Sequence, residues 1–152
     1  MIKRILILFA IDQLSMMGYS QTPKWAEKAK KAVFSVVTYD ANDKILNTGN
    51  GFFISEKGVA ISDYALFKNA QRAVIITSEG EKMPVKAILG ANDMYDVVKF
   101  SVDITSKKVA NLTLSETPMT EGSKLWLLPY STQKVRSLTS GNVNSVDKIS
   151  DY

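Results

Sequence analysis

Apolar and polar residues alternate over short segments in much of the chain between residues 33 and 102. β-Branched and aromatic residues are frequent in these segments, and Asp, Asn and Gly residues separate them, which is typical of strands joined by turns. The expected strands are Val33–Tyr39, Lys44–Thr48, Gly51–Ser55, Val59–Ser62, Ala73–Thr77, Met83–Leu89 and Asp96–Val102. Short strands at such close spacing predict an all-β fold, and they suffice to close one small barrel.

A helical pattern precedes the first strand. Thr22 is suited to cap a helix, and Pro23 fits the first helical position. Apolar residues then recur at helical spacing on one stripe, namely Trp25, Ala29, Ala32 and Val33. This pattern predicts a short amphipathic helix over about residues 23–31, with the lysines between them on its solvated face. A second short helix or tight turn is expected over Asp63–Ala70.

A second unit is expected to begin near Leu112. Gly122–Tyr130 and Lys134–Val146 each carry a strand-like pattern. Two or three strands with one apolar face do not readily bury that face by themselves. The second unit therefore either packs on the first barrel or is the beginning of a larger one.

The N-terminus has the layout of a secretory signal peptide. Lys3 and Arg4 form a basic start, Ile5–Ile11 is an apolar run of seven residues, and Gly18–Ser20 follows the small-x-small pattern. The run is shorter than the roughly 20 residues that span a bilayer. We expect removal of residues 1–20 and no stable membrane span afterwards, the alternative being an N-terminal helix or an uncleaved anchor. An exported chain without Cys fits a secreted or periplasmic protein of a bacterial envelope.

The composition excludes several kinds of chemistry. The chain contains neither Cys nor His, so it has no disulfide, no thiol nucleophile, no Cys/His zinc site and no imidazole base. The net charge of +4 is scattered, without the basic stripe and aromatic platforms of a nucleic-acid interface. Asp93 and Asp96 lack the further oxygen ligands of a cation site and are expected to be turn residues. We therefore expect no metal, no cofactor and no nucleic-acid partner.

Three segments occur in an order and spacing that point to a known family. Thr48–Ser62 is similar to a pattern that begins S/T-G-x-G-F-x-I and continues through a Gly-containing turn into an apolar strand. Tyr95–Phe100 is similar to a D-L-A-V-L-K strand. Lys124–Tyr130, followed by Gly141–Val146, is similar to the first hairpin of a second barrel. Together they resemble the trypsin-like serine peptidase domains of bacteria, of the HtrA/Deg-like type.

The resemblance implies a fold and a division of the chain. The fold would be a trypsin-like double β-barrel behind a short N-terminal helix, with the first barrel complete and the second one partial. The signal peptide would occupy residues 1–20 and the amphipathic helix residues 21–31. The first barrel would occupy residues 32–110, and the truncated start of the second residues 111–152.

The resemblance also implies an incomplete catalytic site. Asp96 matches the triad acid, but the triad His is matched by Ala65, or by Tyr64 after a shift of one residue. Ala has no titratable group and Tyr titrates near pH 10, so neither takes the serine proton near neutral pH. The G-x-S-G-G motif of the family would lie beyond this stretch. Ser140 and Ser145 do not lie in such a motif and are expected to be strand or turn serines.

Three functions remain open at this point. The first is a catalytically inactive peptidase homologue, or the N-terminal part of one, that binds peptide or protein segments in the cell envelope. The second is a secreted serine endopeptidase whose catalytic Ser lies beyond residue 152, which would need a base other than His, such as a Lys. The third is an unrelated small β-barrel that binds a ligand through its loops.

Overall fold

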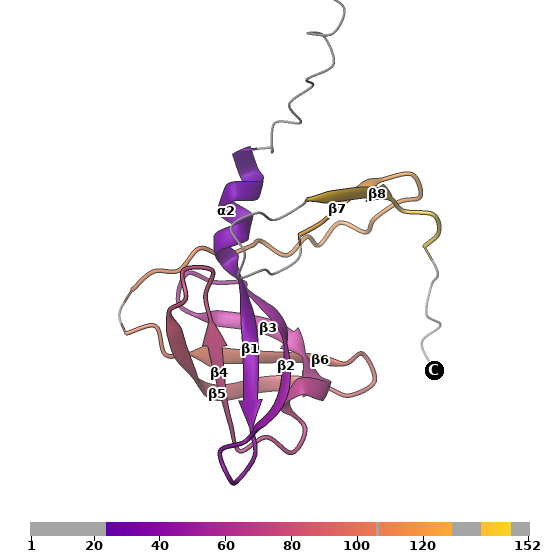
Figure 1. The fold of residues 1–152 in the computed structure, drawn as a ribbon. Coiled ribbons are helices and arrows are strands. Elements are labelled where there is room, and N and C mark those ends of the chain that lie inside the picture. The colour runs from indigo at the N-terminus through magenta and orange to yellow at the C-terminus, as the bar shows by residue number, and fades with distance from the viewer. Residues whose placement is uncertain (1–23, 106, 129–137, 147–152) are drawn as a thin grey trace, which may run out of the picture.

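The computed structural model describes residues 24–105, 107–128 and 138–146 (Figure 1). These residues form one α-helix, one 3₁₀ helix (η2) and eight strands. The elements are α2 (Lys24–Ala32), β1 (Val33–Tyr39), β2 (Ile45–Phe53), β3 (Val59–Asp63), η2 (Tyr64–Phe67), β4 (Arg72–Ile76), β5 (Lys82–Asn92), β6 (Val97–Val102), β7 (Lys124–Leu127) and β8 (Thr139–Asn142). The all-β class that the strand pattern predicts is confirmed.

Six strands close into an antiparallel barrel in the order β1-β2-β3-β6-β5-β4. β1 closes the ring, because it pairs with β2 along one edge and with β4 along the other. The pairing with β4 runs from Ser35 opposite Ile76 to Tyr39 opposite Arg72. Closure gives every strand of the barrel two neighbours, so none of the six is an edge strand along its whole length.

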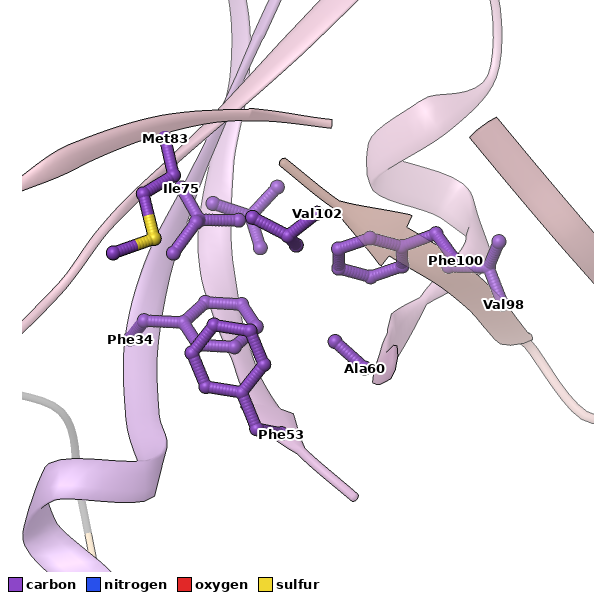
Figure 2. Close-up of a cluster of buried hydrophobic side chains, with 9 residues drawn as sticks. Phe34, Phe53, Ala60, Ile75, Met83, Val98, Phe100 and Val102 are labelled. Carbon is purple, nitrogen blue, oxygen red and sulfur yellow. The ribbon is translucent and has the colours of Figure 1, made fainter. Parts of the chain in front are cut away.

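Aromatic rings fill the inside of the barrel (Figure 2). The ring of Phe34 lies 4.7 Å from that of Phe53 and 6.3 Å from that of Phe100, measured between centroids. All three side chains are fully buried, and they come from β1, β2 and β6. The remaining buried members of this core are Val36, Ala60, Ile75, Met83, Val98 and Val102.

β2 differs from its prediction as two separate strands. The structure has one continuous strand in which Gly49 pairs with Val36 and Asn50 pairs with Ser35. The glycines mark close approaches rather than a turn. A Cβ on Gly51 would lie 2.6 Å from the Phe34 ring and 2.9 Å from the Ile61 carbonyl oxygen. A Cβ on Gly49 would overlap the side chain of Leu66.

The helix buries a narrower stripe than the sequence predicts. The apolar stripe predicts Trp25 on the buried face, but its side chain is 47% exposed. The buried face consists of small residues, Ala26, Ala29 and Ala32. Because α2 runs directly into β1 at Val33, the strand fixes how the helix is rotated. Trp25 instead makes an edge-on contact with Trp126 of β7, with 5.8 Å between the ring centroids.

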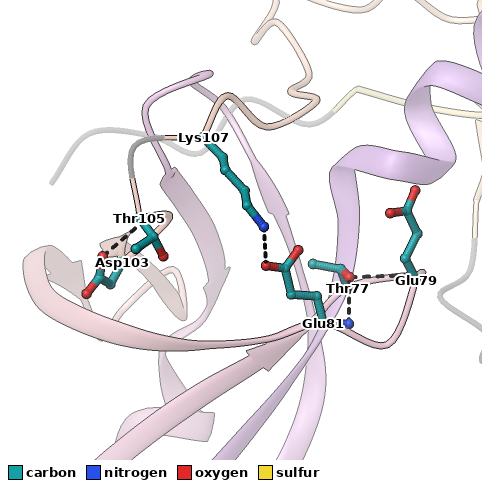
Figure 3. A network of polar contacts seen from close by, with 6 residues as sticks. All are labelled: Thr77, Glu79, Glu81, Asp103, Thr105 and Lys107. Atoms are coloured by element: carbon teal, nitrogen blue, oxygen red, sulfur yellow. Dashed lines mark hydrogen bonds and ion pairs between the residues drawn. The ribbon is translucent and has the colours of Figure 1, made fainter.

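The segment after β6 is tied back to the turn between β4 and β5 (Figure 3). The Thr77 hydroxyl accepts hydrogen bonds from the backbone N–H groups of Glu79 (3.3 Å) and Glu81 (3.1 Å). Lys107 forms an ion pair of 3.0 Å with the Glu81 carboxylate. Ile104 of the same segment packs against the core. These contacts cover the end of the barrel at which β6 finishes.

The second unit is a two-stranded sheet in the described residues. β7 and β8 pair in an antiparallel register from Lys124 opposite Asn142 to Leu127 opposite Thr139. Every residue of both strands is exposed. Part of each strand expected here, over Gly122–Tyr130 and Lys134–Val146, lies outside the described residues. Two strands do not by themselves show a second barrel, which remains a prediction.

The close approach at Gly51 predicts a stability difference between two glycine substitutions. Gly51→Ala should lower the free energy of unfolding by about 1–3 kcal/mol, because its methyl group forces the Phe34 ring and the Ile61 backbone apart. Gly141→Ala is the matched control, since a Cβ there meets nothing within 4 Å. Urea unfolding followed by circular dichroism measures both. Equal stabilities of the two variants would contradict the packing described here.

Candidate functional site

η2 is fixed to the end of the barrel by its own backbone and by one ring. The buried Thr38 hydroxyl donates to the Leu66 carbonyl oxygen at 2.9 Å, and the Asn47 side-chain amide donates to the same oxygen at 3.3 Å. The Phe67 ring packs on Phe100 with 5.1 Å between centroids. The expected short helix over Asp63–Ala70 is therefore a 3₁₀ helix with a well-defined position.

Asp96 caps this 3₁₀ helix from the loop between β5 and β6. Its carbonyl oxygen accepts from the backbone N–H of Tyr64 at 3.2 Å, and its carboxylate Oδ1 accepts from the N–H of Ala65 at 2.6 Å. Asp63, the residue at the usual capping position, makes no side-chain capping bond. Asp96 has a φ of 50°, a left-handed conformation that Asp tolerates better than most residues. A carboxylate 31 positions away thus satisfies the first amides of η2.

The fold brings together the two positions that the sequence analysis singled out as catalytic matches. Ala65 and Asp96 are both exposed, and one hydrogen bond joins them. The carboxylate is able to orient a donor, but the Ala65 methyl group offers nothing that takes or returns a proton. Ser140 lies in β8 opposite Trp126, Ser145 follows that strand, and both are exposed.

Asp93 does not join Asp96 in a cation site. Its carboxylate forms an ion pair with Lys68, whose ammonium group also lies 5.4 Å from the centroid of the Tyr64 ring. The hydrogen bond to Asp93 raises the pKa of Lys68 above its ordinary value. Within the part of the chain that the structure describes, no three acidic side chains gather where they could hold a metal ion. The turn interpretation fits the backbone, since the Asp93 carbonyl accepts from the Asp96 N–H at 3.4 Å.

An apolar groove of about 480 Å³, here called the tryptophan groove, lies on the outside of the barrel. β2, β3 and the start of β6 form its floor, and α2 and β7 form its walls. Its lining residues are Trp25, Ala29, Val33, Asn50, Gly51, Phe52, Ile61, Ser62, Asp63, Val97, Leu112, Trp126 and Leu128.

The floor of the groove is apolar because two outward-facing residues are cross-strand partners. Phe52 of β2 pairs with Ile61 of β3, and both side chains are half-buried. Asp63 is the one charged residue among the described lining residues, and it pairs with Val97, the neighbour of Asp96. One end of the groove is therefore lined by residues next to the Ala65–Asp96 contact in the chain. The sequence pattern alone does not predict this groove, although Phe52 and Ile61 at outward-facing strand positions are a signal of it.

The chain matches no protein-family model, and it has no significant match among curated proteins. Its structural class is therefore described from the fold alone. The chain is a closed six-stranded antiparallel β-barrel with a capped 3₁₀ helix at one end and an apolar groove on its outer surface. In the described ranges, no helix has the length and apolar character to cross a bilayer. The expected signal peptide, residues 1–20, lies outside those ranges.

The position of Asp96 predicts the ionisation of a histidine introduced at residue 65. In Ala65→His, the ring starts a few bonds from the amide that already touches the carboxylate, so Asp96 should favour the charged imidazolium. We expect the imidazole pKa to rise by about one unit above the ordinary value of about 6.5. NMR titration of the ring protons measures it.

The control for this titration is a second substitution at the acid. Asp96→Asn keeps a side-chain oxygen that can accept from the Ala65 N–H but removes the charge. In the double variant the imidazole pKa should return to its ordinary range. Lys57→His, in an exposed turn, gives the reference value for a solvated histidine. If the imidazole pKa of Ala65→His is the same with and without the Asp96 charge, the Asp96 carboxylate does not lie close to the side chain at residue 65.

Proposed function

We propose that the chain is a catalytically inactive trypsin-like peptidase homologue of the HtrA/Deg-like type, or the N-terminal part of one. It binds peptide or protein segments in the cell envelope. The closed antiparallel barrel supports the fold part of this proposal, and the tryptophan groove supports the binding part. The envelope location rests on the sequence pattern of residues 1–20.

The observation that carries the proposal is the hydrogen bond between Ala65 and Asp96. The resemblance aligns these residues with the base and the acid of a triad, two groups that must touch for catalysis. They are 31 positions apart, and the fold nevertheless places the Asp96 carboxylate 2.6 Å from the Ala65 amide nitrogen. In the proposed homologue the residue that matches the acid is kept and the residue that matches the base is an alanine. Such a pair does not transfer a proton, and binding rests on the groove.

The groove beside this site has the properties of a binding surface. Monomeric proteins rarely leave a contiguous apolar patch open unless it binds a partner. Here Trp25 and Trp126 are 47% and 40% exposed, and large aromatic side chains are the residues that most often anchor a partner. Asp63 at one end supplies a carboxylate that favours a positively charged group there. We therefore expect an extended segment with apolar side chains and a basic end.

Tryptophan fluorescence tests this function directly, because the chain has two tryptophans and both line the groove. We expect end-blocked peptides rich in Leu and Phe, with one Lys at an end, to shift the emission to shorter wavelength in a saturable way. Phe52→Ser removes the apolar floor without touching either tryptophan, and it should weaken binding by about tenfold.

Ile45→Ser is the matched control for Phe52→Ser. Ile45 is in the same strand and 64% exposed, but it does not line the groove. It should bind peptide as the parent does, and thermal melts should show that both variants are folded. Absence of any saturable shift across the peptide panel, or equal weakening by both substitutions, would refute binding in the tryptophan groove.

A further inference from the structure

β5 has a long stretch of edge that its neighbour does not cover. β4 pairs with β5 at only three positions, which end at Val74 opposite Pro84. β5 continues to Asn92 and pairs with β6 on its other side. Among the described residues, no strand pairs with the β4-facing edge of β5 beyond Pro84. β4 and β5 are therefore paired at the start of β5 and unpaired along the rest of it.

The divergence of β4 and β5 has a local cause. Pro84 has no backbone N–H to continue the ladder. Two irregularities follow, between Val85 and Ala87 and between Ile88 and Gly90, which leave Lys86 and Leu89 without partners on β6. Such bulges bend a strand and change the direction of its edge. β5 therefore turns away from the line of β4.

The uncovered edge is exposed and partly apolar. Every residue over 86–92 is exposed, and the side chains of Ile88 and Leu89 are 50% and 51% exposed. A strand directs alternate backbone N–H and C=O groups to each side. On an uncovered edge these groups form a row of donors and acceptors at the spacing of another strand. The partner that matches such a row is an extended polypeptide.

A cavity of about 250 Å³ lies in the gap between the two strands. Apolar side chains of Phe67, Val85 and Ile88 contribute to its lining. Two cations, Arg72 and Lys86, also line it, and none of its lining residues is acidic. The cavity suits one apolar side chain of a strand laid along β5, with an acidic neighbour beside it.

The two cations differ in how firmly they are held. Arg72 donates from Nε to the Asp43 carboxylate at 2.7 Å, and its guanidinium lies 3.6 Å from the centroid of the Tyr39 ring. Lys86 forms no ion pair in the described part of the chain. Arg72 is therefore a fixed side chain whose charge is balanced by Asp43. Lys86 is the cation available to a carboxylate of the partner.

We propose that the edge of β5 over Ala87–Asn92 binds an extended acidic peptide by adding it as a strand, with one apolar side chain in the cavity beside Arg72. This site is separate from the tryptophan groove. A second copy of the chain is the less suitable occupant. It would bring its own bulges and its own Lys86 to the edge, and these are features that oppose edge-to-edge pairing.

NMR of the ¹⁵N-labelled full chain tests the proposal with short end-blocked peptides that alternate Val and Asp. We expect saturable amide shifts and slowed amide exchange within Ala87–Asn92. Lys86→Glu should weaken binding by about fivefold through loss of the charge pair. Lys57→Glu makes the same charge change in an exposed turn and should leave the affinity unchanged. Peptides that alternate Val and Lys should bind more weakly than the acidic series.

A backbone variant separates strand addition from simple charge attraction. Leu89→Pro removes an N–H at a position without a partner on β6, so the ladder to β6 is kept while the edge is blocked. It should abolish the shifts.

Three results would overturn the proposal: equal binding of the Lys series, unchanged binding by Leu89→Pro, or concentration-dependent shifts of these amides without peptide, which would indicate self-association. The amides of Ala87–Asn92 report binding at this edge, whereas tryptophan emission reports binding in the groove. A negative result for one site therefore leaves the proposal for the other site untouched.

Discussion

The pairing of β1 with both β2 and β4 is the constraint on which the rest of the structure depends. It turns a six-stranded sheet into a closed barrel and commits Phe34 to the interior, where the ring meets Phe53 and Phe100. That ring in turn requires a glycine at position 51. The closed barrel then provides an end on which η2 rests through Phe67. Without closure the candidate site would have no fixed platform.

The Ala65–Asp96 contact has a structural role that is independent of any chemistry. Asp96 satisfies the first backbone amides of η2 whether or not a base is present, because it bonds to the backbone of residues 64 and 65 rather than to a side chain. The cap on η2 is therefore independent of which side chain stands at position 65. Neither the core nor the lining of the tryptophan groove includes Ala65 or Asp96, so the binding role proposed above does not require proton transfer at this contact.

The sequence predicts an element well where the local pattern of residues determines its bounds. It predicts an element poorly where pairing with a distant strand determines them. β1 has the predicted bounds, since β-branched residues and a following turn fix Val33–Tyr39 locally. Gly49 and Asn50 looked like a turn because their role depends on Leu66 and on the partners that β1 supplies. Ala65 and Asp96 were singled out through a family resemblance, and their hydrogen bond could not be predicted from the sequence pattern because 31 positions separate them. The groove and the uncovered edge of β5 depend on register, which the sequence does not display.

The most direct test of the central claim is whether the protein purified from its source cleaves the peptides that it binds. Mass spectrometry of a defined peptide mixture after prolonged incubation, with bound and free fractions separated, measures both properties in one experiment. The account predicts that apolar peptides are recovered intact in the bound fraction and that no new fragments accumulate. Fragments that appear with time and disappear with a serine-directed inhibitor would contradict it, and would show that the chain belongs to an active serine peptidase.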